Sequence, residues 1–475
     1  MVAAMTDRFH DFAALLDRAC ELHLVPGLAA AVVTGDHIAA LGASGIADLA
    51  TGEKADPSHI SRWYSISKSI TALAVLAEAS RGRIDLDAPV TRLVPGLAFA
   101  DPFSHAHASL RDCLLHRTGL LSGNWTWDAA STDPAELLRR IVHQPCPHLL
   151  GQGFHYQNQH FVIIREALRL AGIDWSAAVS ELLAPLGATI ITRQADFIAA
   201  RRFAPHGPNG LTLPERIADP EIDGIAAAGG ICGNIGSLAA VAGMMAGRGT
   251  WKGITTVPRD RWDAATAPVF KNDDGSSSER VNAWAALAGT WTTYRGHRLL
   301  AWAGGYRGWT SHVVAVPTLG IGACCLGNRT ASAVVEAVCL ALIDRAAGLE
   351  PIPWVERYAE SKKKMRAAGA QRVKERLSRP KAAWPAPPEQ LAGTFHHPGY
   401  GDLQISAAGD AANLRYRFVE LPLVPRDGGR CSADASIDGG EYCWDLTPMI
   451  VAGRATAWRF GPDSSAHPVE FKRVG

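Results

Sequence analysis

Segments with the pattern of β-strands lie at both ends of the first 350 residues, whereas the long middle of this region has helical spacing. Near the start, the apolar run 28–33 precedes the turn residues Thr34, Gly35 and Asp36, which predicts the first hairpin of a sheet. The arrangement predicts an α+β fold, in which an antiparallel sheet built from both ends is flanked by helices and interrupted by a helical insertion. The later strands are expected at residues 284–293, 298–303, 311–316 and 320–326.

One helix of this region is apolar on almost every side. It is expected at residues 66–79, with Gly82 placed to end it. Such a helix should be buried on most faces, so polar residues at its start need a partner or a function. The other helices are expected at residues 9–22, 135–142, 161–170, 237–245, with Ser237 as N-cap, and 331–346.

The last 125 residues have a different composition. Residues 351–389 combine a Lys- and Arg-rich helix at 356–378 with a Pro-rich linker. Beyond them, short strand-like stretches are separated by Gly, Asp and Ser, which predicts a small all-β domain, a barrel or a sandwich, over residues 390–475. The first domain is expected to span residues 1–350. The strands of the small domain are expected at 403–405, 414–418, 442–446, 455–460 and 469–472.

The 475-residue chain is nearly neutral and has ample apolar material for a core. Hydrophobic residues make up 47%, and 47 Lys and Arg against 46 Asp and Glu leave a formal charge of +1. The net charge creates no strong electrostatic field that would attract the chain to nucleic acid or to an anionic membrane. A small molecule is therefore the expected partner. Whether the small β-domain covers a crevice or pairs subunits of a homo-oligomer stays open.

Nine scattered cysteines without a CxxC pair favour neither a disulfide framework nor a zinc cage, and they are expected to be buried thiols. The first residues lack the long apolar core of a signal peptide. No apolar stretch approaches the roughly 18 to 20 residues that span a bilayer. We therefore expect a cytoplasmic protein with no membrane partner, no metal and no cofactor.

The chemistry centres on Ser65-Ile66-Ser67-Lys68 at the start of the buried helix. Residues three apart on a helix share a face, so the Lys68 amine can reach the Ser65 hydroxyl. Burial would lower the pKa of Lys68 toward the range in which an amine accepts a proton. The alternative is that Ser65 only caps the helix and that Lys68 is solvated. Two further Ser-x-x-Lys matches, at residues 361–364 and 378–381, lie in the charged linker, where a hydrated lysine keeps its ordinary pKa.

Two further motifs extend this hypothesis. Tyr156 and Asn158 flank Gln157, and in extended chain their side chains would point the same way. A phenol beside an amine can shuttle a proton, and an amide can hold a substrate carbonyl. Trp302-Ala303-Gly304-Gly305 ends an apolar strand, where the amide of Gly305 could form an oxyanion hole with that of Ser65. Alone, each is also compatible with an ordinary turn or hairpin.

In this order, the three motifs resemble the serine β-lactamase and penicillin-binding protein superfamily. The similarity is to its class C-like serine hydrolases, which include D-alanyl-D-alanine carboxypeptidases, D-aminopeptidases and family VIII carboxylesterases. It covers about residues 10–345 and includes the loop Leu114–Leu120 and the segment Ala228–Ile231. Residues 391–401 are similar to the lipocalin-like β-domain that follows many such hydrolases.

The resemblance implies roles for individual residues. Ser65 would be the acylated nucleophile, Lys68 its base, Tyr156 the proton shuttle and Asn158 the residue that orients the acyl group. Where the family has Lys-Thr-Gly or His-x-Gly, this chain has Trp302-Ala303-Gly304. Because an indole carries no charge, recognition of a substrate carboxylate should be poor, unless Arg307 supplies a cation. An uncharged ester or amide is therefore the expected substrate.

The sequence lacks the motifs of several other catalytic classes. The chain has no Walker loop, no GxGxxG, no HExxH and no GxSxG elbow. Ser122-Gly123-Asn124 has the form of an SxN motif, but it directly follows the His116 loop and is expected to be loop structure. A D-amino-acid peptidase or a β-lactamase is the alternative enzyme. An inactive binding or regulatory member of the fold is the alternative from another class.

Overall fold

The computed structural model describes residues 7–128, 131–207, 213–272, 279–330, 332–437 and 440–474. By their internal contacts, the residues form two compact units. Unit 1 comprises Met1–Ala88, Ser109–Leu115 and His160–Lys363, and unit 2 comprises Pro89–Ala108, His116–Gln159 and Lys364–Gly475. The domain division at residues 350 and 389 stays a prediction, because contact units and domains need not share boundaries.

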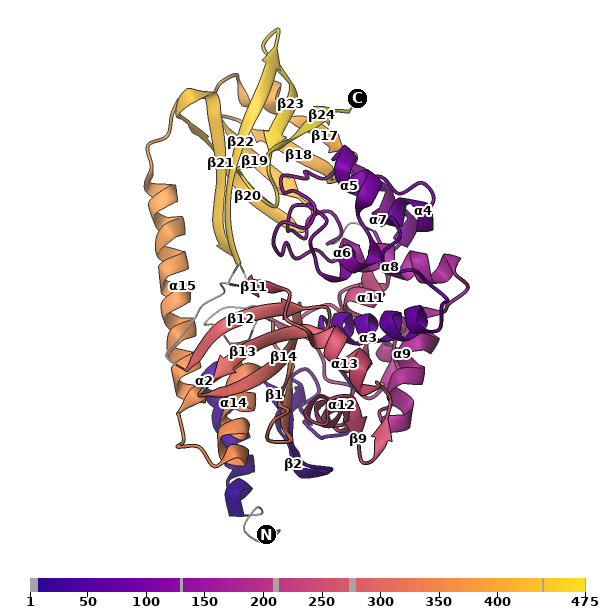
Figure 1. The fold of residues 1–475 in the computed structure, drawn as a ribbon. Coiled ribbons are helices and arrows are strands. Elements are labelled where there is room, and N and C mark those ends of the chain that lie inside the picture. Colours follow the sequence, from indigo (N-terminus) through magenta and orange to yellow (C-terminus); the bar gives the residue numbers. More distant parts are fainter. Residues whose placement is uncertain are drawn as a thin grey trace. The chain divides into compact units, whose positions relative to one another are not determined.

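Unit 1 contains the predicted antiparallel sheet, which has nine strands within the described residues (Figure 1). The first hairpin and the last strand pair directly, since Leu28 lies opposite Gly327 and Thr34 opposite Ile321. The sheet is thus built from both ends of the region, as the sequence predicts. In spatial order its strands are β11 Phe270–Asn272, β12 Arg280–Ala286, β13 Gly289–Tyr294, β14 His297–Tyr306, β15 Trp309–Val316, β16 Ile321–Gly327, β1 Gly27–Thr34, β2 His37–Asp48 and β3 Glu53–Lys54.

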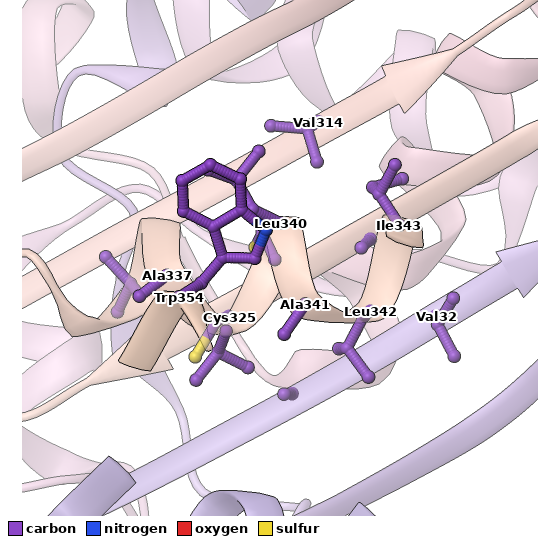
Figure 2. Packing of buried hydrophobic residues seen from close by; sticks show 14 of the residues in the cluster. Val32, Val314, Cys325, Ala337, Leu340, Ala341, Leu342, Ile343 and Trp354 are labelled. Atoms are coloured by element: carbon purple, nitrogen blue, oxygen red, sulfur yellow. The ribbon is translucent and has the colours of Figure 1, made fainter. Parts of the chain in front are cut away.

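Helices cover both faces of the central strands, which explains why β1 is buried along its whole length. Leu28, Ala30 and Val32 pack into a core with α2 Phe12–His23 and α14 Val334–Ala347. Figure 2 shows part of this core, including Val32, Leu340 and Trp354. On the opposite face, α12 Ile235–Ala246 packs against β1 and β16.

The remaining elements of unit 1 are mostly helices and two-residue strands. Those between about residues 88 and 246 belong to the predicted helical insertion, the rest of which lies in unit 2. The remaining elements of unit 1 include the helices α3 Ile66–Ser80, α6 Leu110–Leu114, α8 Gln159–Leu170, α9 Trp175–Leu183, α10 Gln194–Ala199, α11 Ala226–Gly229 and α13 Arg259–Thr266. The short strands are β4 Ser61–Arg62, β5 Ile190–Ile191, β6 His206–Gly207, β7 Glu215–Arg216, β8 Cys232–Gly233, β9 Thr250–Trp251 and β10 Ile254–Thr255.

Unit 2 ends in a closed barrel, which confirms the small all-β domain and shows that it is not an open sandwich. Closure removes the exposed sheet edges that an eight-stranded open sheet would leave. The barrel strands are β17 Gly393–His397, β18 Gly401–Ala408, β19 Ala411–Tyr416, β20 Val419–Arg426, β21 Arg430–Ile437, β22 Gly440–Val451, β23 Arg454–Phe460 and β24 Val469–Arg473. The helices of the unit are α4 Val90–Leu93, α5 Pro102–His107, α7 Pro134–Arg139, α16 Pro388–Leu391 and the end of α15 Trp354–Ser378, which begins in unit 1.

Two details of the sequence prediction are wrong. Ser237 is not the N-cap of α12, because the Asn234 side chain accepts the hydrogen bond from the Ser237 amide and the helix begins at Ile235. The strand predicted at 284–293 is two strands, β12 and β13, joined by a tight turn. Gly289 supplies the left-handed backbone of this turn with a φ of 105°, which the surrounding apolar residues conceal in the sequence.

Candidate active site

Ser65 stands at the junction between β4 and α3, directly before the first helical residue. The preceding residue, Tyr64, has a φ of 45°. This is a left-handed backbone conformation that residues other than glycine rarely adopt. Its phenol holds it in place by donating a hydrogen bond to the backbone oxygen of Arg307 at 3.0 Å. A strained turn before a helix is a common way to present a side chain for reaction.

Lys68 lies one helical turn beyond Ser65 and is buried, with only 6% of its surface exposed. Its Nζ donates to Ser65 Oγ at 2.9 Å and to the backbone oxygen of Ala228 at 2.9 Å. Burial lowers the pKa of Lys68 well below its usual range. The Ser65 side chain makes no capping hydrogen bond. The structure therefore differs from the alternative in which Ser65 only caps the helix and Lys68 is solvated.

The segment around α11 holds this turn of α3 from the other side. Thr71 Oγ1 donates to the backbone oxygen of Ala227 at 3.0 Å, and Ser67 Oγ accepts from the backbone amide of Ile231 at 3.0 Å. Together with the bond from Lys68, these contacts tie one turn of the helix to residues 227–231. The amine is thus held beside the hydroxyl by backbone groups, whose positions are fixed by the fold.

Gly304 of β14 approaches the backbone at Ser65 closely. A Cβ atom at this position would lie 2.1 Å from the backbone oxygen of Trp63 and 2.8 Å from the amide nitrogen of Ser65. Ser311 on the neighbouring strand donates from Oγ to the same Trp63 oxygen at 2.7 Å. The strand backbone therefore borders the start of α3 at a distance that only glycine permits.

Replacing Gly304 with alanine is expected to lower kcat/KM for a p-nitrophenyl ester by about 100-fold or more, because the new methyl must push the strand away from the Ser65 amide. Gly305→Ala is the matched control, since it keeps the backbone amide and its Cβ would meet the Thr310 side chain at 3.3 Å and the backbone oxygen of Trp309 only at 3.9 Å. Steady-state kinetics and thermal unfolding of both variants provide the test. Equal losses in the two variants would contradict the importance of this close approach.

Trp302 is buried, with 2% of its surface exposed, and its indole N–H donates to the backbone oxygen of Ala288 at 3.1 Å. Its ring lies 6.5 Å from that of Trp262. The single donor of the indole is therefore bonded inside the fold, where it gives no charge and no second hydrogen bond to a carboxylate.

Tyr156 belongs to unit 2. It is exposed, with 37% of its surface accessible to solvent. Its ring stacks on that of His116, with 4.6 Å between centroids and 25° between planes. His116 also accepts a hydrogen bond from the Gln157 amide at Nδ1, at 3.0 Å, and from the His155 amide at its backbone oxygen, at 2.7 Å. The loop that contains His116 thus supports the chain on both sides of Tyr156.

Asn158 is nearly buried, at 8%, and its amide donates to Asn124 Oδ1 at 3.2 Å. A further link is a parallel β-bridge between Gly123 and Gln157. The Ser122-Gly123-Asn124 segment is loop structure, as the sequence predicts, but its contact with Asn158 is not evident from the sequence. The only signal was its SxN form.

The candidate residues are thus distributed over both units. Unit 1 contains Ser65, Lys68, Trp302, Gly304 and Gly305, and unit 2 contains Tyr156 and Asn158.

Within the described ranges, no group of three or more His, Cys, Asp or Glu side chains is placed to hold a metal ion. Nor is any helix in those ranges long and apolar enough to cross a bilayer.

Comparison with known proteins extends this description. Esterase EstB from Burkholderia gladioli is 31% identical over 227 residues, which are 43% of this chain and 56% of EstB. The match thus spans about half the length of that relative.

Solved structures share the fold. The octameric penicillin-binding protein homologue from Pyrococcus abyssi has a TM-score of 0.63 at 16% identity, over 94% of this chain and 96% of that one. The D-amino acid amidase from Ochrobactrum anthropi SV3 has a TM-score of 0.58 at 19% identity, over 71% of this chain and 97% of that one. The family model described as Beta-lactamase matches residues 12–348, which include the sheet, the buried helix and all the candidate residues. This chain is therefore a member of the Beta-lactamase family.

Proposed function

We propose that the chain is a serine hydrolase that forms an acyl-enzyme on Ser65 and cleaves an ester or amide bond of a small molecule. The observation that carries this proposal is the buried Lys68 amine, 2.9 Å from the Ser65 hydroxyl. A lysine in water stays protonated near neutral pH, whereas this one is desolvated and its pKa is lowered. Its neutral form has a lone pair that can accept the serine proton.

The proposed reaction has two halves. In the first, Lys68 takes the proton of Ser65 Oγ, the oxygen attacks the substrate carbonyl, and the amides of Ser65 and Gly305 receive the negative oxygen. Tyr156 passes a proton to the leaving alcohol or amine, while Asn158 orients the acyl group. In the second half, a water molecule gives a proton to Tyr156 and attacks the acyl carbon, the bond between that carbon and Ser65 Oγ breaks, and the proton held by Lys68 returns to Ser65 Oγ as the acid leaves. The roles of Tyr156 and Asn158 come from the family resemblance.

The proposed substrate carries no carboxylate at the recognised end. The supporting observation is that Trp302 uses its N–H inside the fold. The family resemblance implies that Trp302 holds the first position of the triplet, where related enzymes have a lysine or a histidine. The similarity to an esterase and the shared fold with a D-amino acid amidase favour the same two substrate classes. A D-amino-acid peptidase or a β-lactamase activity would need another cation, for which Arg307 is the candidate.

A substrate panel tests this ranking. We expect kcat/KM for short-chain p-nitrophenyl esters to exceed that for nitrocefin by about 10- to 100-fold, since a carboxylate that leaves water without an ionic partner loses on the order of 1.5 to 3 kcal/mol. D-Amino acid amides and D-Ala-D-Ala peptides complete the panel. Faster turnover of nitrocefin, or of peptides with a free carboxylate, would reverse the proposed specificity.

The alternative from another class is a binding protein that has this fold without turnover. It predicts that a fluorophosphonate leaves Ser65 unmodified, whereas the hydrolase proposal predicts one adduct per chain on that residue.

The Pyrococcus abyssi homologue is described as octameric, which supports a further proposal that this chain forms a homo-oligomer. Light scattering gives the mass that decides it.

A further inference from the structure

A carboxylate of the barrel holds the loop that contacts Asn158. Asp463 lies in the connection between β23 and β24. Its Oδ1 accepts hydrogen bonds from the backbone amides of Asn124, at 2.8 Å, and Trp125, at 3.2 Å. All three residues belong to unit 2. Two adjacent amides aimed at one carboxylate oxygen fix both the position and the direction of the loop backbone.

The loop and the barrel are fitted to each other around this carboxylate. A Cβ atom at Gly123 would lie 2.0 Å from Asp463 Cγ, so a side chain at position 123 would displace the carboxylate. The ring of Trp125 lies 5.2 Å from that of Tyr416 and 5.3 Å from that of Trp444, both residues of the barrel core. The packing of Trp125 places the loop on the barrel, and the Asp463 carboxylate sets the orientation of the loop.

The same loop makes direct contacts with the Tyr156-Gln157-Asn158 segment. Asn158 donates to the side-chain oxygen of Asn124, and Gln157 Nε2 donates to the backbone oxygen of Leu121 at 3.1 Å. The bridge between Gly123 and Gln157 adds a third link. Displacing the loop backbone at residue 124 would therefore move the hydrogen-bond acceptor of Asn158.

Asp463 lies in a buried environment that disfavours its charged form. Burial raises the pKa of Asp463 to about 6, although two backbone amides and the Tyr400 hydroxyl stabilise its charged form. A residue needed only to fill space would not have to carry this charge. The burial thus agrees with a requirement for a strong acceptor at this position.

We propose that Asp463 is a positioning residue for the hydrolase reaction: through the backbone of Asn124 it orients Asn158, and so links the C-terminal barrel to catalysis. This inference rests on the proposed function, in which Asn158 orients the acyl group. Asp463 itself is not proposed to touch the substrate.

The test begins with two substitutions of Asp463 in the full chain. Asp463→Ala removes the acceptor and is expected to lower kcat for a p-nitrophenyl ester by about 10- to 100-fold, with a smaller change in KM, because a misplaced orienting group slows the reaction more than binding. Asp463→Asn keeps a side-chain oxygen and is expected to restore kcat to within about threefold of the wild type. Asp434→Ala is the matched control, since Asp434 is a barrel carboxylate that bonds to Arg376 and not to the loop.

A double-mutant cycle with Asn158→Ala then tests the route. If Asp463 acts through Asn158, Asp463→Ala should change kcat less than about threefold in the Asn158→Ala background. The proposal is overturned by wild-type kcat in Asp463→Ala, by an equal loss in Asp434→Ala, or by the full loss persisting without Asn158. Should Asp463→Ala not fold, Gly123→Ala can replace it in the test, because its side chain displaces the same carboxylate and the same changes in kcat are expected. Wild-type kcat in Asn158→Ala or Ser65→Ala would instead refute the proposed function.

Discussion

Replacing Ser65 with alanine is expected to lower kcat/KM for p-nitrophenyl acetate by at least about 1,000-fold, because the reaction loses the only group that forms the acyl intermediate. The fold should be unaffected, since the Ser65 side chain makes no capping hydrogen bond. Steady-state kinetics give the rate, and circular dichroism with thermal unfolding gives the state of the fold.

Ser80→Ala is the matched control for this substitution. Ser80 is the last residue of the same helix, and its hydroxyl bonds only locally, to the backbone oxygen of Ala77 at 2.7 Å. Its kcat/KM should remain within about twofold of the wild type, as is usual for an exposed residue outside the site. If Ser65→Ala kept a tenth or more of the activity, another residue would be the nucleophile.

Replacing Lys68 with methionine is expected to have two opposite effects. The rate should fall by about 100- to 10,000-fold, because the proton of Ser65 loses its acceptor. The free energy of unfolding at neutral pH should rise, because a buried amine is exchanged for an apolar side chain of similar length. Kinetics and urea denaturation on the same preparation measure both.

The pH dependence of stability checks the cause of the second effect. Because the pKa of Lys68 is lowered in the folded chain, the unfolded chain binds more protons at neutral pH, and this group's contribution to the free energy of unfolding rises with pH. The stability advantage of Lys68→Met should therefore shrink as the pH rises toward the ordinary pKa of lysine. Lys252→Met, which alters an exposed lysine, should show no such trend. A constant advantage would mean that Lys68 is not desolvated.

The features that the sequence predicts correctly follow from spacing, composition and strand patterns. Ser65 and Lys68 are one helical turn apart, and the apolar residues that follow in α3 predict a buried helix, so spacing and composition suffice. The α+β fold is likewise predictable from strand patterns at both ends of the first 350 residues, because a lone hairpin must find partners. The sharp turn at Tyr64 is not, since tyrosine gives no sign of a positive φ.

The features that the sequence does not predict depend on distant contacts. Asn124 and Asp463 are 339 positions apart, and neither belongs to a periodic pattern. The sequence does not predict the barrel strands β17, β20 and β21, because alternation over few residues is weak evidence, and Pro422 and Pro425 further weaken the strand pattern of β20. The cap of α12 was misplaced by three residues because Asn234 and Ser237 are both good caps.

The acyl-enzyme on Ser65 can be detected directly by the mass of the chain during turnover. A p-nitrophenyl ester is mixed with the enzyme, the reaction is quenched in acid within milliseconds, and the digested chain is analysed by mass spectrometry. We expect to find the acyl group on Ser65, and we expect the Lys68→Met variant to acquire it far more slowly. Turnover with Ser65 unmodified, or with the acyl group on another residue, would show that Ser65 is not the nucleophile.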